Sequence, residues 1–114
     1  MDVYIKHYFF SLYDLLHLKD WSTMQEFRTT VASLVGLHAR PAALFSRSAK
    51  DSGCLVRLAK VSEGVLSDFV DGTSILRVMT LGVKCGDEIV VQVEGENEVV
   101  AAAALRTLAE STAH

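Results

Sequence analysis

The residue with the strongest case for chemistry is His38. The chain has four histidines, but His7 and His17 lie in an unusual first segment and His114 is the last residue. Only His38 stands where the chain must change structure, two residues after Gly36 and just before a sequence typical of a helix start. Because glycine permits a tight turn, we expect His38 at the junction of a loop and a helix.

The surroundings of His38 are those of an anion-binding site. A helix that begins at Ala39 offers free backbone N–H groups and the positive end of its dipole, and Pro41 suits a first turn because it has no N–H to leave unpaired. Arg40 can add a guanidinium fork. Since a neutral imidazole is a nucleophile at physiological pH, a histidine in such a site indicates that the ring itself receives the anion. A phosphoryl group fits this chemistry.

Hydrophobic periodicity predicts the elements that position His38. Alternating residues predict strands over 26–31, 54–58, 65–70 and 87–94, and spacings of three and four predict helices over 39–50, 75–81 and 98–110. Ser74 is the expected N-cap of the second helix, and Gly53 and Gly82 are expected to end the first two helices. The predicted inward positions of the first and last helices are Ala42, Phe45, Ala49, Ala101, Ala104, Leu105 and Leu108.

This order, β-α-β-β-α-β-α, predicts an α+β fold in one domain over residues 24–114. We expect a two-layer α+β sandwich, in which three helices cover one face of a four-stranded antiparallel sheet and the other face meets solvent. A composition of 50% apolar and 22% charged residues with one proline excludes disordered and collagen-like chains. The net charge of −3 argues against a polybasic nucleic-acid binder.

The two cysteines give no sign of a metal site or a redox motif. Cys54 and Cys85 form no C-x-x-C pair, and no histidines stand near them in the sequence to complete a zinc site. We therefore expect two free thiols in a reducing compartment.

Residues 1–23 differ from the rest in their density of aromatic and aliphatic residues. Charged residues such as Lys6, Asp14 and Lys19 interrupt the apolar run, so it is too broken for a membrane helix, which needs about 20 apolar residues. It also lacks the layout of a signal peptide. Two interpretations remain, namely a short amphipathic helix that docks on another surface, or a misplaced start with the protein beginning at Met24.

Two motifs resemble one known family. Residues 36–43 read G-L-H-A-R-P-A-A, and residues 74–82 read S-I-L-R-V-M-T-L-G. Both resemble HPr, the histidine-containing phosphocarrier of the bacterial phosphoenolpyruvate:sugar phosphotransferase system. G-D-E-I at 86–89, followed by E-G at 94–95, resembles the last strand and turn of the family. The resemblance covers about residues 25–112 and implies an open-faced β-sandwich with the same order of elements.

The resemblance implies a role for each residue of the first motif. His38 matches the histidine that accepts phosphate on Nδ1 from enzyme I and passes it to sugar-specific IIA domains, and Arg40 matches the arginine that assists this transfer. Counted from Met24, His38 falls where the family's histidine usually falls, which favours the later start. The implied protein is a cytoplasmic phosphoryl relay rather than a self-sufficient enzyme, with no cofactor, metal, nucleic acid or membrane insertion.

The second motif implies a regulatory site. Ser74 matches the serine that an ATP-dependent serine kinase/phosphorylase modifies in some Gram-positive bacteria, which slows sugar transport and promotes binding to a catabolite-control transcription factor. Thr73 stands where responsive members often carry lysine, and an N-cap role alone is sufficient for Ser74. The hairpin around residues 60–68 is also longer than in common members.

The resemblance further implies a partner surface that joins the loop around His38 to the short helix. Exposed apolar residues there would suit docking, and Arg47 with Arg77 would add a positive rim against acidic partners. The implied partner-binding residues are Ala39, Arg40, Leu44, Ile75, Leu76, Arg77, Met79 and Thr80, with Leu76 and Met79 expected to be exposed.

Three other interpretations stay open. A regulatory or nitrogen-branch HPr paralogue would control transcription through protein–protein contacts, although a purely regulatory form often lacks the histidine that is present here. A nucleic-acid-binding module would need basic charge and aromatic residues on its sheet, whereas Glu88, Gln92 and Glu94 are expected to face outward. The third is an interaction domain whose first segment drives oligomerisation.

Overall fold

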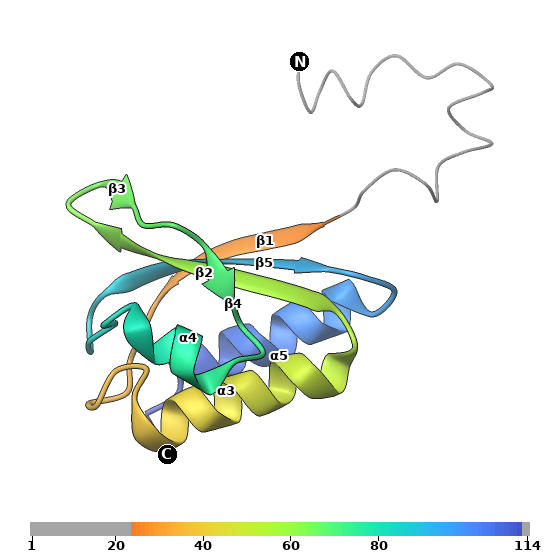
Figure 1. The fold of residues 1–114 in the computed structure, drawn as a ribbon, viewed down its shortest axis with the longest axis horizontal. Coiled ribbons are helices and arrows are strands. Elements are labelled where there is room, and N and C mark those ends of the chain that lie inside the picture. The colour runs from red at the N-terminus through yellow and green to blue at the C-terminus, as the bar shows by residue number, and fades with distance from the viewer. Residues whose placement is uncertain (1–23, 113–114) are drawn as a thin grey trace, which may run out of the picture.

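The computed structural model describes residues 24–112, in which strands and helices follow the predicted order (Figure 1). The elements are β1 (Gln25–Thr30), α3 (Ala39–Ser52), β2 (Leu55–Ser62), β3 (Val65–Leu66), β4 (Val70–Asp71), α4 (Ile75–Thr80), β5 (Glu88–Glu94) and α5 (Glu98–Glu110). The predicted α+β class is confirmed. The expectations about residues 1–23 and His114 lie outside the described residues.

β5 lies at the centre of the sheet and joins its two halves. It pairs antiparallel with β1 on one side and with β2 on the other, while β3 and β4 both pair with β2. In this register Val91 stands opposite both Phe27 and Leu58, and all three side chains are buried. A row of apolar side chains therefore crosses the sheet on the face that meets the helices.

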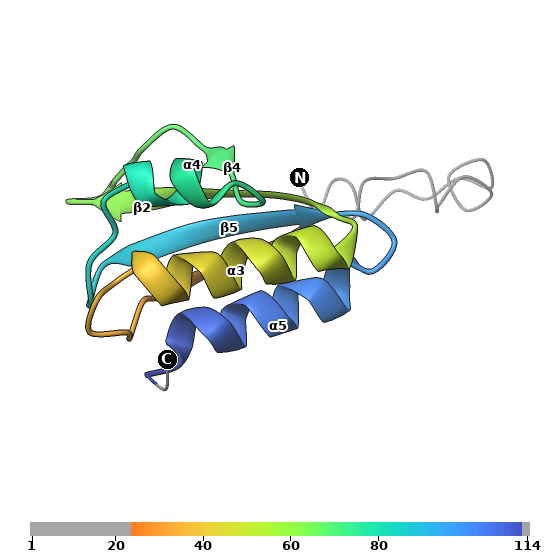
Figure 2. The ribbon, with the colours of Figure 1, turned by 60° about the horizontal axis from the view of Figure 1, so that its bottom comes forward.

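The helices α3 and α5 lie side by side on one face of the sheet and run in opposite directions (Figure 2). The N-terminal end of α3 therefore lies beside the C-terminal end of α5. The short helix α4 packs against α3 and places Val78 in the same core. No helix within residues 24–112 has both the length and the apolar character needed to cross a membrane.

The helix α3 carries the site, and its apolar spacing holds it on the sheet. Ala42, Phe45 and Ala49 are buried, as their spacing of three and four predicted. The helix runs to Ser52, two residues beyond the predicted end at residue 50. It stops at Gly53, as predicted, where a left-handed residue with φ 74° donates its N–H to a carbonyl of the last turn.

The predicted third strand over residues 65–70 is wrong in one respect, because a bulge divides it into β3 and β4. Leu66 of β3 pairs with Val61, whereas Val70 of β4 pairs with Leu58. Three residues between the two short strands therefore face only two residues of β2. One extra residue interrupts the ladder and bends the strand, as in other β-bulges. The longer hairpin of β2 and β3 projects from the sheet beyond this break (Figure 1).

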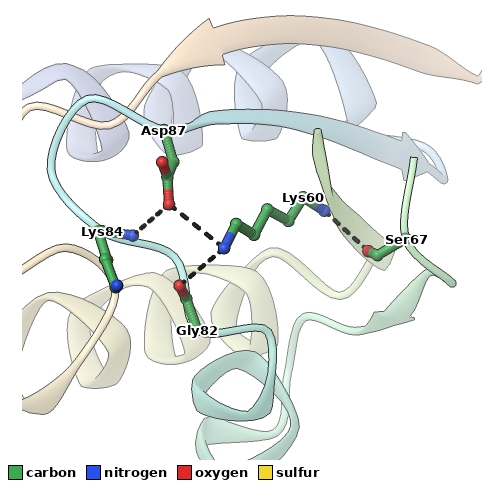
Figure 3. A network of polar contacts seen from close by, with 5 residues as sticks. All are labelled: Lys60, Ser67, Gly82, Lys84 and Asp87. Carbon is green, nitrogen blue, oxygen red and sulfur yellow. Dashed lines mark hydrogen bonds and ion pairs between the residues drawn. The ribbon is translucent and has the colours of Figure 1, made fainter. Parts of the chain in front are cut away.

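Lys60 ties this hairpin to the loop between α4 and β5 (Figure 3). Its backbone N–H donates to the Ser67 Oγ at 3.0 Å, which bridges the bulge. Its ammonium group donates to the Gly82 carbonyl at 3.2 Å and lies 3.5 Å from the Asp87 carboxylate. That carboxylate also accepts from the Lys84 N–H at 2.8 Å. These contacts fix the conformation of the loop.

The last helix, α5, buries a different stripe from the predicted one. Ala101 and Leu105 are buried as expected and Leu108 is half-buried, but the prediction for Ala104 is wrong because that residue is exposed. Ala109 is buried instead. Consecutive helical residues point about 100° apart, so a stripe centred on Leu105 leaves Ala104 outside it.

Both cysteines are free, as predicted from their spacing. Cys54 is buried at the start of β2, whereas Cys85 is exposed in the loop before β5 and directs its thiol to the Ala32 carbonyl at 3.6 Å. A buried thiol of this kind behaves as a small hydrophobic side chain.

Removing the charge of Asp87 should weaken the acid dependence of stability. The hydrogen bond from the Lys84 N–H, and then the Lys60 ammonium, hold the pKa of Asp87 below its usual range. The resulting stabilisation is present above the unfolded pKa of about 4 and is lost as the pH falls through the lower folded pKa. We expect Asp87→Asn to lose about 1 kcal/mol or less at neutral pH, and to lose less stability than the wild type on further acidification, as measured by urea unfolding across pH.

The control is Asp68→Asn, which removes a carboxylate from the segment between β3 and β4 without breaking an ion pair among residues 24–112. This variant should keep the steep acid dependence of the wild type. Parallel pH slopes for the wild type and Asp87→Asn would contradict the role given to the Lys60–Asp87 pair.

Candidate functional site

His38 stands at the N-cap of α3, as the sequence predicted. Its backbone is extended, with φ −129° and ψ 165°, so the chain enters the helix directly after it. The side chain is exposed and makes no capping hydrogen bond. Because the ring has no hydrogen-bond partner within residues 24–112, both of its nitrogens are open to an incoming group.

The first turn of α3 presents unpaired N–H donors beside His38. The first helical hydrogen bond runs from the Ala42 N–H to the His38 carbonyl at 3.5 Å. The N–H groups of Ala39 and Arg40 precede it and have no partner in the described part of the chain, and Pro41 has none to offer. Two free donors thus stand at the positive end of a 14-residue helix, an arrangement that favours an anion.

Ala39 has an unusual backbone conformation directly after His38. Its φ of 48° lies in the left-handed region, which only one other non-glycine residue, Glu63, shares between residues 24 and 112. A left-handed alanine costs about 1–2 kcal/mol, and strain of this kind clusters at functional sites. The bend sets the direction in which the chain leaves His38 and enters the helix.

The turn before His38 is held against the loop that precedes β5. Leu37 is buried, and its N–H donates to the Val83 carbonyl at 3.0 Å. Gly36 has φ 65° and comes so close to this loop that an added Cβ would lie 2.1 Å from the same carbonyl oxygen. His38 is therefore displayed on a turn that two tight backbone contacts hold in place.

The arginines of the chain divide into two groups. Those of β1, β2 and α5 each form an ion pair with a glutamate. Those of α3 and α4, namely Arg40, Arg47 and Arg77, are exposed and form no ion pair within the described residues. The helices α3 and α4 thus carry guanidinium groups that an external anion could pair with.

Comparison with known proteins agrees with this geometry. The family model described as "PTS HPr component phosphorylation site" matches residues 25–111. The phosphocarrier protein HPr of Streptomyces coelicolor is 40% identical over 90 residues, which cover 79% of this chain and 89% of that protein. The chain belongs to the HPr family. It is a phosphocarrier of the phosphotransferase system, and HPr proteins interact with the enzymes of that system.

Solved HPr structures share the fold. The crystal structure of HPr from Bacillus anthracis str. Ames has a TM-score of 0.69 and 31% identity, and the match covers 77% of this chain and 99% of that one. Crh, the catabolite repression HPr of Bacillus subtilis, has a TM-score of 0.55 and 30% identity over 76% of this chain and 98% of its own. The open-faced β-sandwich expected from the motifs is therefore confirmed.

The partner surface implied by the HPr motifs is continuous, because α3 packs against α4. Leu76 is 75% exposed and Ile75 is 43% exposed. Ala39, Arg77 and Thr80 are also exposed, and Leu44 is half-buried. The expectation that Met79 is exposed is wrong, because its side chain is half-buried and packs against the core.

Ser74 caps α4, as predicted. Its Oγ accepts a hydrogen bond from the Arg77 N–H at 3.2 Å. The segment before it is fixed by Asp71, whose carboxylate accepts from the Thr73 N–H at 2.9 Å and from the Thr73 hydroxyl at 2.8 Å. These bonds, the backbone bond first, lower the pKa of Asp71. The N-cap role of Ser74 is therefore seen directly, whereas its phosphorylation stays a prediction.

Sequence reasoning missed two residues beside His38. Leu34 is 89% exposed and Val35 is 56% exposed, and both border a cavity of about 330 Å³ together with Arg40. The sequence does contain a feature that points to them, because Leu34 and Val35 are adjacent apolar residues in a segment with no helical or strand periodicity. Periodicity does not say where a loop side chain points, so their exposure could not be predicted.

Replacing Gly36 should destabilise the protein through the turn before His38. In Gly36→Ala the added methyl group would meet the Val83 carbonyl at 2.1 Å, at a φ of 65° that alanine also disfavours. We expect the free energy of unfolding to fall by at least about 2 kcal/mol, as measured by urea unfolding.

The matched control is Gly53→Ala. This glycine has a similar φ of 74°, but an added Cβ would meet nothing within 4 Å, so only the left-handed strain of about 1–2 kcal/mol applies. Equal losses for the two variants would show that the contact with Val83 does not constrain the turn.

Proposed function

We propose that His38 carries the phosphoryl group of this phosphocarrier, accepting it on Nδ1 from the phosphohistidine of enzyme I and donating it to sugar-specific IIA domains. The observation that carries the proposal is the exposed imidazole at the N-cap of α3, beside free N–H groups and an unpaired Arg40. The His38 ring and the groups that could hold the phosphoryl oxygens thus lie together within residues 38–40.

The proposed transfer needs only a nucleophilic imidazole and donors that hold the phosphoryl oxygens. The lone pair of the His38 Nδ1 attacks phosphorus, and the P–N bond of the donor breaks as its electron pair returns to the donor imidazole. The proton on the His38 Nε2 is released as the new P–N bond forms, and the donor imidazole takes up a proton, so the two rings exchange one phosphoryl group for one proton. The phosphoryl oxygens would then lie near the free N–H groups of Ala39 and Arg40, which favour negative charge together with the helix dipole. Arg40 can pair with two of these oxygens. The proposed transfer uses no water molecule and no cofactor as a reactant.

The reaction belongs to a complex of two proteins, so the chain is a relay rather than a self-sufficient enzyme. The unpaired Arg47 and Arg77 support docking of acidic partners on α3 and α4. The exposed Leu76 and Ile75 support an apolar centre for the same contact. Enzyme I and the IIA domains are the partners we assign to this face, and the cytoplasm is the compartment in which we place them.

The relay is tested by labelling with enzyme I and phosphoenolpyruvate. The wild type should gain the mass of one phosphoryl group, and mild acid should remove it because phosphohistidine is acid-labile. His38→Ala should gain nothing, since the nucleophile is absent. Full labelling of His38→Ala would overturn the assignment.

The same assay separates Arg40 from the other arginines. Arg40→Ala should still be labelled, but about 10²-fold more slowly, because a charge-assisted pair to the phosphoryl group is lost. Arg106→Ala is the control, since its guanidinium is occupied by Glu110 at 3.0 Å on α5. Equal labelling rates for the two variants would remove Arg40 from the transfer.

We also propose Ser74 as a regulatory phosphorylation site that a serine kinase/phosphorylase would recognise, with a catabolite-control transcription factor as reader. The proposal is supported by its position at the start of α4, next to the exposed Ile75 and Leu76. A dianionic group there would change the charge of the docking face. The regulatory paralogue is the alternative function, and the similarity to Crh favours testing it.

The two roles of Ser74 can be separated by substitution. Ser74→Ala should lower the free energy of unfolding by about 1 kcal/mol, because the cap on the Arg77 N–H is lost. Ser74→Asp keeps an acceptor at the cap and should retain wild-type stability, while slowing transfer from enzyme I through its added charge. If Ser74→Asp is labelled at the wild-type rate, charge at this position does not regulate the relay.

A further inference from the structure

A fixed turn holds two apolar side chains in solvent just before His38. Leu34 and Val35, which we name the 34–35 prong, are 89% and 56% exposed. The Gly36 N–H closes the turn on the Ser33 carbonyl at 2.9 Å, and the Val35 N–H lies 3.4 Å from the Ser33 Oγ. Ser33 itself is buried. The prong is therefore presented by an anchored backbone, and the loop that carries it projects beyond the start of α3 (Figure 1).

The prong borders the same hollow as the arginine of the site. A cavity of about 330 Å³ lies between the prong and the first turn of α3. Its lining residues are Ser33, Leu34, Val35, Ala39, Arg40, Pro41 and Thr112. An apolar edge and an unpaired guanidinium thus face one space beside His38.

A protein that contacts His38 has the prong and this cavity within reach of its interface. Four residues of extended chain span at most about 14 Å, so Leu34 lies within that distance of His38. A stable interface buries about 800 Å² on each partner, which corresponds to a circle of roughly 16 Å radius. The footprint of a partner centred on His38 is therefore wide enough to reach the prong.

We infer that the 34–35 prong seats in an apolar recess next to the phosphohistidine of the donor protein and sets the affinity of the chain for that donor. Charge complementarity points to the donor, since the free N–H groups and the unpaired Arg40 suit a partner that arrives with the phosphoryl group. The inference rests on the proposed function of His38. Apolar contact is the same before and during transfer, so it lowers KM without changing kcat.

The test compares the second-order rates of labelling from phosphorylated enzyme I for Leu34→Ser, Val35→Ser and the wild type. We expect kcat/KM to fall about tenfold for Leu34→Ser, with most of the loss in KM. The melting temperature should stay unchanged, because the side chain is almost fully exposed. Val99→Ser is the control, since Val99 is 63% exposed in the first turn of α5, at the end remote from His38 (Figure 2).

The outcomes separate this inference from the function on which it rests. If an active enzyme I does not phosphorylate the wild type, the proposed function is wrong, and the inference about the prong is overturned together with it. If the wild type is labelled and Leu34→Ser matches it, only the inference is overturned. A loss seen in kcat alone, a loss confined to transfer onward to IIA domains, or a change only in self-association on a sizing column would each overturn it as well.

Discussion

The hydrogen bond from the Leu37 N–H to the Val83 carbonyl is the constraint on which the site depends. It forms because Gly36 has no side chain to keep the two segments apart. Leu37 then packs into the core, and the chain emerges at His38 with its ring in solvent. The loop that supplies the carbonyl is in turn held by Lys60 and Asp87. The hairpin of β2 and β3 thus helps to hold His38 in place, although it forms no hydrogen bond with His38 within the described residues.

Among residues 24–112, the arginines are paired with carboxylates in one part of the molecule and unpaired in another. On the sheet and on α5, arginine and glutamate neutralise one another at the surface. On α3 and α4, the arginines are exposed and form no ion pair within the described residues. A chain with a net charge of −3 can therefore offer a locally positive surface, because no carboxylate within the described residues forms an ion pair with Arg40, Arg47 or Arg77.

Much of the site could be predicted because its features are local. The positions of His38 and Arg40 at the start of α3 followed from a short motif, and the N-cap role of Ser74 followed from its place before an apolar stripe. The bulge between Leu66 and Val70 could not be predicted in this way, because a shift of one residue in register depends on the partner strand. The burial of Met79 likewise depends on how α4 packs against α3, and the exposure of Leu34 depends on how a loop is held.

The antiparallel arrangement of α3 and α5 has a practical consequence for anyone who handles this protein. Thr112 borders the hollow beside Arg40, whereas Gln25 borders a different hollow that includes Val99, at the opposite end of α5. A tag, fluorophore or biotin attached after residue 112 therefore starts beside the surface that we propose for partner docking. A sensor chip that holds the protein by that end would bring its own surface close to the proposed docking surface and could lower the measured binding. Labels belong before β1.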